Sequence, residues 1–147
     1  MPRLSRPMLF ASPEECERAF YEALASADLE ALSDLWLQDD DVCCIHPGSS
    51  RLIGYAAVRA SWAAILAAGP LVITTLARRS FESPGLAVSS LIEEVVVTQG
   101  GARQLVQLLA SNAFTKTPAG WKMILHMGVP APEGQAMQSE APTGTVH

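Results

Sequence analysis

Two histidines and an asparagine are the side chains of this sequence best suited to chemistry. His46 follows a short run of β-branched and cysteine residues and precedes Pro47 and Gly48, so we expect it at the end of a strand. The ordinary pKa of an imidazole lies near neutrality, which lets it give or take a proton at physiological pH. The alternative is structural, with the ring hydrogen-bonded to a backbone carbonyl that fixes the turn. An imidazole that faces an internal cavity would favour acid–base catalysis.

His126 and Asn112 lie in two later segments with strand patterns. On a regular strand His126 shares a face with Lys122 and Ile124, whereas Met123 takes the other face. If the Met123 face lines a cavity, we expect His126 on the outer surface at a dimer contact. A β-bulge in this strand would instead turn His126 toward the cavity. Asn112 stands among apolar neighbours, so its amide must either orient a ligand or tie down a loop.

Further side chains are candidates for binding a ligand. Glu93 and Glu94 are adjacent, so one faces inward on a regular strand. An inward carboxyl has a pKa raised by desolvation and can act as a base, but we favour solvated positions near the rim or a pairing with Arg103 or Arg78. Arg51, in the loop after His46, is either a carboxylate-binding group or a solvated arginine. The remaining candidates are mainly core by their spacing, and we expect them to line a pocket for a flat apolar ligand: Trp62, Tyr21, Tyr55 and Met123.

The sequence predicts no metal ion and no cofactor. It contains no HxH or CxxC spacing, no phosphate-binding glycine loop and no serine-nucleophile motif. The cysteines are Cys16, Cys43 and Cys44, and this odd number with two adjacent members is not a disulfide framework. We therefore expect reduced cysteines and a cytoplasmic protein.

Composition limits the partners. The 147 residues fit one domain, and with 49% hydrophobic and 17% charged residues we expect part of the surface to meet a second copy of the chain. The net charge of −5 without a basic stripe argues against nucleic acid. Apolar runs are too short to span a membrane, and no basic cluster favours its surface.

The sequence also predicts the helices and strands that position these residues. Ser12, Pro13 and Glu15 form a capping box that opens a helix, on which Glu17 lies away from the apolar face. A second short helix begins after Asp28 and a third covers 55–68. The predicted strands are 42–46, 71–81, 86–98, 102–117 and 121–129, joined in the second half by short turns typical of an antiparallel meander.

These elements predict an α+β domain. Three helices must cover one face of a strongly curved antiparallel or mixed sheet, which leaves a cone-shaped cavity open at one end. We expect a flexible arm over 1–11, the domain over 12–129 and a disordered tail over 130–147.

Three segments together resemble the nuclear-transport-factor-2-like superfamily in its SnoaL-like branch, over residues 12–129. They are FYEALASADLEALSDLW, DVCCIHPGSSRLIGYAAVRASW and ASNAFTKTPAGWKMILHMG. The resemblance implies the cone fold of ketosteroid isomerases and polyketide cyclases and a homodimer formed through the sheet. Two departures stand out. The last strand carries one histidine where relatives often have more. The isomerases pair a tyrosine with an aspartate, and no predicted strand here has an aspartate that could pair with Tyr21.

The expected function is therefore binding of an apolar small molecule in the cone. It includes cofactor-free acid–base catalysis of the isomerase, cyclase or dehydratase type, with His46 as acid or base and Asn112 or His126 orienting the substrate. The alternatives are a ligand-binding module without turnover and a dimeric assembly module whose cone is filled by core side chains.

Overall fold

The computed structural model describes residues 9–132, so most of the predicted arm and tail lies outside the described residues. The described part forms three helices, α1 (Pro13–Ala25), α2 (Leu29–Leu35) and α3 (Tyr55–Leu66). Six strands accompany them, β1 (Cys43–Ile45), β2 (Leu52–Ile53), β3 (Ile73–Ser83), β4 (Leu86–Gln99), β5 (Ala102–Thr117) and β6 (Gly120–Pro130). The α+β prediction is confirmed.

The helices begin where the sequence predicts. Ser12 Oγ accepts a hydrogen bond of 3.1 Å from the backbone N–H of Glu15, whose carboxylate accepts one of 2.9 Å from Ala11 N–H. Asp28 caps α2 in the same way, through a 3.1 Å bond from Ala31 N–H. Such caps satisfy N–H groups that the first helical turn leaves without partners.

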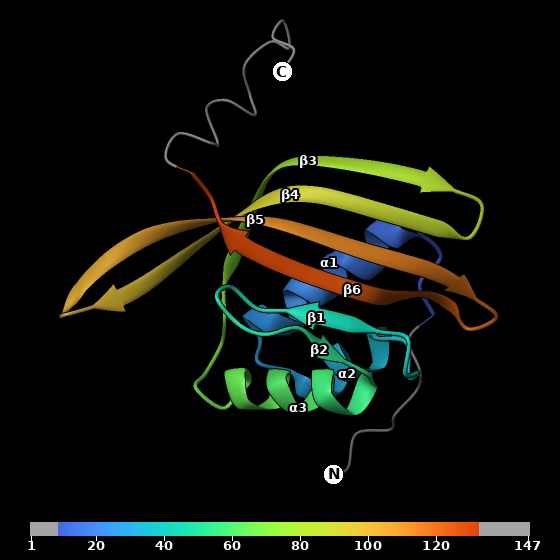
Figure 1. Ribbon diagram of the computed structural model, residues 1–147, viewed down its shortest axis with the longest axis horizontal. Coiled ribbons are helices and arrows are strands. Elements are labelled where there is room, and N and C mark those ends of the chain that lie inside the picture. Colours follow the sequence, from blue (N-terminus) through green and yellow to red (C-terminus); the bar gives the residue numbers. More distant parts are fainter. Residues whose placement is uncertain (1–8, 133–147) are drawn as a thin grey trace, which may run out of the picture.

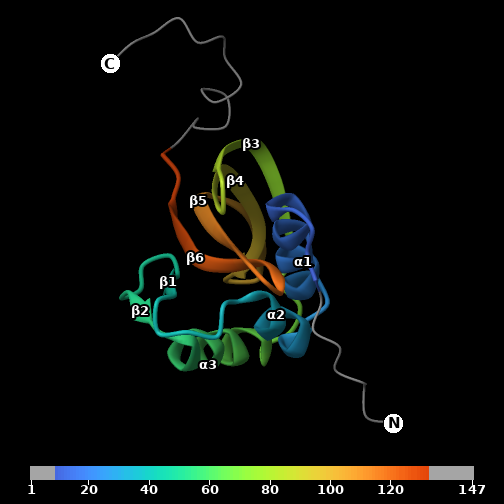
Figure 2. The same cartoon turned by 90° about the vertical axis from the view of Figure 1, so that its right-hand side faces the viewer.

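The strands form one sheet in the order β2-β1-β6-β5-β4-β3. Strands β3 to β6 make the predicted antiparallel meander, but β1 pairs parallel with β6, so the sheet is mixed. The segment predicted as a loop after His46 contains β2, which pairs with β1. The sheet curls around α1, with α2 and α3 beneath it (Figure 2). The β4–β5 hairpin extends past the other strands on the left of Figure 1.

Two β-bulges change which side chains face the helices. On β3 the register shifts between Leu76 and Arg79, and Ala77 adopts a positive φ of 52°. On β6 Ala113 pairs with Leu125 and Phe114 with Met123, which leaves Ile124 as the extra residue. A bulge turns the following side chains to the opposite face. Met123 and His126 are therefore both buried on the helix side, at 0% and 4% exposure.

The core lies between the helices and the concave face of the sheet. Its fully buried side chains include Phe20 and Leu24 of α1, Trp36 after α2, and Phe114 of β5. Burial of each such side chain contributes about 1.5–3 kcal/mol. Phe10 belongs to this core, and its carbonyl accepts a 3.0 Å hydrogen bond from Trp121 N–H.

Candidate functional site

A partly open cavity of about 300 Å³, which we call the inner cavity, lies on the concave side of the sheet. Three of its lining residues carry polar groups that titrate: His46 after β1, Glu93 on β4 and His126 on β6. The rest of its wall is almost wholly apolar: Pro47, Trp62, Ile65, Leu71, Ile73, Val95, Val97, Val106 and Leu108. A small apolar space with a few convergent polar groups is the usual form of a small-molecule site.

His46 is fixed from two sides. Its ring packs edge-on against Trp62, with ring centroids 4.7 Å apart, and its Nε2 lies 3.0 Å from Ser61 Oγ. Ser61 Oγ also lies 2.8 Å from the carbonyl of Val58, which can only accept, so we assign the single hydroxyl proton to Val58 and make Nε2 of His46 the donor to Ser61. Nδ1 therefore carries the lone pair. Burial lowers the pKa of His46 below its ordinary value, so the neutral, basic form prevails near neutral pH.

His126 is held by Asn112. Its Nδ1 lies 2.7 Å from Asn112 Oδ1, and its ring packs against Phe20 and Trp62. Burial, together with the nearby charge of His46, lowers the pKa of His126 to about 3. The ring is therefore neutral, with Nδ1–H donated to Asn112 and Nε2 without a hydrogen-bond partner among the described residues.

Glu93 is the inward-facing member of the glutamate pair, with 2% exposure, while Glu94 accepts from Gln107 at 2.7 Å. Tyr21 donates its hydroxyl proton to Glu93 Oε2 at 2.7 Å. Burial raises the pKa of Glu93, although the bond from Tyr21 opposes the rise. The solvated rim position that we favoured for Glu93 is wrong, because the concave curvature places this part of β4 under α1.

Glu17 is the site residue that sequence reasoning missed. The helical pattern placed it away from the apolar face, yet its side chain is buried, at 4% exposure. Its carboxylate accepts hydrogen bonds from Arg78 Nε, Ser89 Oγ and Asn112 Nδ2, the last at 2.9 Å. These partners come from β3, β4 and β5, so only the folded sheet reveals why a charge is tolerated there.

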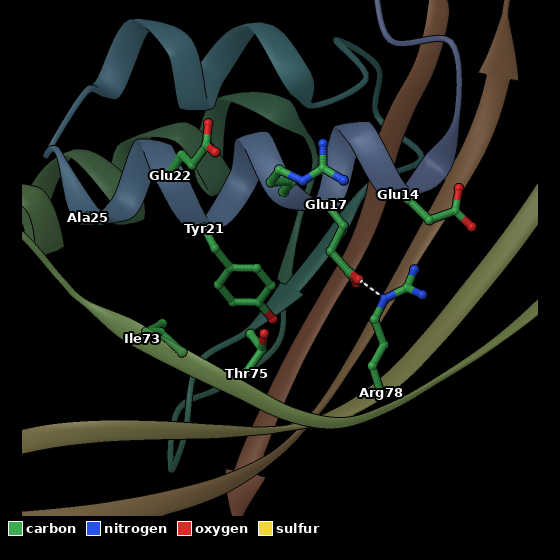
Figure 3. A pocket seen from close by; sticks show the side chains of 9 residues that line it. Glu14, Glu17, Tyr21, Glu22, Ala25, Ile73, Thr75 and Arg78 are labelled. Atoms are coloured by element: carbon green, nitrogen blue, oxygen red, sulfur yellow. Dashed lines mark hydrogen bonds and ion pairs between the residues drawn. The ribbon is translucent and has the colours of Figure 1, made fainter.

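A second, larger hollow of about 480 Å³, the outer cleft, lies between α1 and β3. Tyr21 hangs from α1 toward Thr75, and the ion pair of Glu17 with Arg78 bridges the two elements (Figure 3). Its wall includes the exposed, charged side chains of Glu14, Arg18 and Glu22. The inner cavity is the better chemical site despite its smaller volume, because its polar groups are desolvated and therefore perturbed.

A model of the SnoaL-like domain matches residues 14–132. The chain belongs to the SnoaL-like family. This confirms the resemblance that the sequence motifs carry.

Solved structures agree with this assignment. A protein from Thiobacillus denitrificans, whose name suggests a calcium/calmodulin-dependent protein kinase type II association domain, is 31% identical, with a TM-score of 0.76 over 85% of this chain and 99% of that chain. A protein from Streptomyces avermitilis, whose name suggests a dehydratase of the NTF2-like family, is 28% identical, with a TM-score of 0.73 over 80% of this chain and 93% of that one. An NTF2-like protein with a cystatin-like fold from Novosphingobium aromaticivorans shares the fold, with 20% identity and a TM-score of 0.65 over 87% and 86% of the two chains. Among curated proteins, none matches the chain.

Other predicted ligand-binding residues of this SnoaL-like domain lie outside the inner cavity. Met123 is buried in the core, and Arg51 is exposed in the loop before β2. Tyr55 donates its hydroxyl to the carbonyl of Ser33 at 3.4 Å and so joins α3 to α2. Tyr21 lines the outer cleft and reaches the inner cavity through Glu93.

Three further features of the SnoaL-like domain bear on what it can bind or do. Over residues 9–132, no group of three or more His, Cys, Asp or Glu side chains is arranged to hold a metal ion, and no helix has the length and apolarity to cross a bilayer. Burial raises the pKa of the thiols of Cys16 and Cys44 to about 12, so neither is a ready nucleophile.

Proposed function

We propose that this SnoaL-like protein is a cofactor-free acid–base enzyme, of the isomerase, cyclase or dehydratase type, for an uncharged apolar small molecule. The observation that carries the proposal is the convergence of His46, His126 and Glu93 on one apolar cavity. The volume of about 300 Å³ lies at the lower end of the range for small-molecule sites, which is about 300–1,000 Å³.

His46 is the general base in this proposal. It is the less buried of the two imidazoles, and its lone pair lies on Nδ1. It takes a proton from the carbon next to a ligand carbonyl, and the electron pair of the broken C–H bond moves onto the carbonyl oxygen. Return of the proton to another carbon completes an isomerisation. Loss of a β-hydroxyl, protonated to water, completes a dehydration.

Glu93 stabilises the oxygen that becomes negative. Burial raises its pKa, and in this proposal Glu93 acts in its protonated form, which donates to a ligand oxygen while Oε2 stays bonded to Tyr21. A hydrogen-bond donor held in a desolvated site is an effective stabiliser of developing charge. Among residues 9–132, no lysine or arginine lines the inner cavity, which favours an uncharged ligand over a carboxylate.

A second candidate function is a non-catalytic ligand-binding or assembly module. The name of the Thiobacillus denitrificans relative points to association rather than catalysis. The outer face of the sheet also exposes apolar side chains, including the cross-strand pair Phe81 and Val88, at 65% and 37% exposure. We propose that a second copy of the chain covers this face, since a monomer would leave it in water. This homodimer is compatible with either function.

Exchange of ligand protons with heavy water tests the catalytic proposal without knowledge of the natural substrate. We would incubate the protein in D₂O with acetophenone and with each of the isomeric hydroxyacetophenones. Loss of the methyl proton signal would be followed by NMR. The wild-type protein should accelerate the exchange, and His46→Ala should remove most of the acceleration, by about 10²–10⁴-fold for a general base. Arg59→Ala is the matched control, because Arg59 is an exposed residue of α3, the helix that carries Ser61 and Trp62.

The two candidate functions give different results in this experiment. Saturable binding of these ketones with exchange no faster than in buffer would contradict the enzyme and favour the binding module. Exchange that is equally fast in His46→Ala would remove His46 from the role of base.

A further inference from the structure

The amide of Asn112 is locked in one orientation. Asn112 has no exposed surface, and its Nδ2 donates to Glu17 Oε2 at 2.9 Å and to Tyr21 Oη at 3.1 Å. Its Oδ1 lies 2.7 Å from His126 Nδ1. A reversed amide would place a carbonyl oxygen against the carboxylate of Glu17, which offers no proton to share. Glu17 therefore determines which end of the amide faces His126.

This orientation selects the tautomer of His126. An amide oxygen only accepts, so the short contact requires the imidazole proton on Nδ1. Nε2 then bears a lone pair, and His126 lines the inner cavity. The ring planes of Phe20 and Trp62, with centroids 5.0 and 5.6 Å away, hold the imidazole in place.

Glu17 is itself anchored by an ion pair and a hydrogen bond. Its other contacts are Arg78 Nε, which forms an ion pair with Oε1, and Ser89 Oγ, a donor to Oε2. The bulge at Ala77 turns Arg78 inward toward α1. Both carboxylate oxygens of Glu17 therefore act as acceptors, Oε1 toward Arg78 and Oε2 toward Ser89 and Asn112, and this is the property that fixes Asn112.

We propose that Glu17 is a positioning residue that acts through Asn112 to hold His126 as the Nδ1–H tautomer, so that Nε2 accepts a hydrogen bond from a hydroxyl group of the ligand. The ligand class narrows accordingly to uncharged apolar molecules with a hydroxyl donor. The role in ligand choice depends on the proposed function of the inner cavity, whereas the role in setting the tautomer does not.

Two-bond ¹H–¹⁵N NMR spectra of the full-length, ¹⁵N-histidine-labelled protein test the tautomer directly. The signals of His126 are identified by their loss in His126→Gln. The wild-type spectrum should show a protonated Nδ1 and an unprotonated Nε2. In Glu17→Gln the new amide can donate to Asn112 Oδ1, so Asn112 reverses and the proton of His126 moves to Nε2. Glu22→Gln, an exposed residue of the same helix, should leave the spectrum as in the wild type.

A wild-type spectrum with the proton on Nε2 would overturn the proposal without any variant, which matters if Glu17→Gln does not fold. An unchanged His126 tautomer in folded Glu17→Gln would overturn the role of Glu17.

Ligand binding tests the hydroxyl separately. At least one of the hydroxyacetophenone isomers should bind about three- to tenfold more tightly than acetophenone, and Glu17→Gln should abolish that difference. If the tautomer responds as expected but no isomer gains affinity, the assigned ligand class is wrong while the positioning role stands. If none of these ketones binds, the proposed function fails instead, and the NMR result still decides the role of Glu17.

Discussion

The hydroxyl of Tyr21 donates a 2.7 Å hydrogen bond to Oε2 of the Glu93 carboxyl group, across 72 residues of sequence. Tyr21 lines the outer cleft and Glu93 lines the inner cavity, so this one contact joins the two hollows. The sequence offered no strand aspartate as a partner for Tyr21. The folded chain supplies a glutamate on β4 in its place, because the curvature of the sheet brings this part of the strand beneath α1.

Removal of that hydroxyl should change the titration of Glu93. The bond from Tyr21 lowers the pKa of Glu93 against the larger effect of burial, so Tyr21→Phe should raise this pKa further. Loss of one buried hydrogen bond should also cost about 0.5–1.5 kcal/mol of stability. A ¹³C NMR titration of the Glu93 carboxyl measures the first effect. Tyr55→Phe serves as control, since Tyr55 donates to Ser33, and a similar shift there would count against the assignment.

Burial of His126 should make the protein lose stability as the pH falls below about 6.5. The folded pKa is about 3 and the ordinary pKa is 6.5, so between these values the unfolded chain binds a proton that the folded chain rejects. Full linkage amounts to about 1.4 kcal/mol per pH unit, or about 2 kcal/mol between pH 6.5 and pH 5. His46 acts in the same direction and Glu93 in the opposite one, because its folded pKa is raised.

The contribution of His126 is isolated by comparison with His126→Gln, which keeps a donor for Asn112. Urea unfolding at pH 5 and pH 7 should show a clearly smaller acid destabilisation in the variant. Equal losses in the two proteins would mean that His126 remains protonatable in the fold.

The ion pair between Glu17 and Arg78, in the wall of the outer cleft, should stabilise the folded protein. Arg78→Gln removes the cation beside a buried carboxylate, although Ser89 and Asn112 still donate to Glu17. Since the side chain of Arg78 is 33% exposed, we expect a loss of about 1–3 kcal/mol in urea unfolding. The neighbouring Arg79 is exposed, and Arg79→Gln should change stability by less than about 0.5 kcal/mol. Comparable losses in both variants would refute the special role of Arg78.

The proposed homodimer predicts a concentration-dependent mass. The wild-type protein should sediment as a dimer at micromolar concentration. Phe81→Lys places a charge in the exposed apolar pair with Val88 and should shift the sedimentation toward a monomer. A monomeric wild-type protein would contradict the dimer.

Local signals explain why much of this fold was predictable. The capping residues at Ser12 and Asp28 mark the starts of helices, and Gly-containing turns separate the long strands. Each of these features depends on neighbours within a few residues, so a single sequence contains the information. The short strand β2 carries little such signal, and only pairing with β1 defines it.

The site was harder to predict because it depends on pairing register. The bulge at Ile124 reverses the faces of β6, and without it alternation would place Met123 inside and His126 outside. The helical pattern alone indicates that Glu17 is solvated. In the folded chain, β3, β4 and β5 place Arg78, Ser89 and Asn112 against its carboxylate. Neither the bulge nor the burial of Glu17 can be predicted from the residues that adjoin it in the sequence.

The occupancy of the inner cavity is the most direct test of the account. We would measure the dissociation constants of acetophenone and of the isomeric hydroxyacetophenones by NMR titration. The titrations compare the wild-type protein with Leu108→Trp, whose larger side chain fills the cavity from β5. Arg103→Trp adds the same side chain at an exposed position of β5. Binding to the wild-type protein should be saturable, should weaken at least about tenfold, or about 1.4 kcal/mol, in Leu108→Trp, and should be unchanged in Arg103→Trp. Binding that is equally tight in a folded Leu108→Trp variant would contradict it.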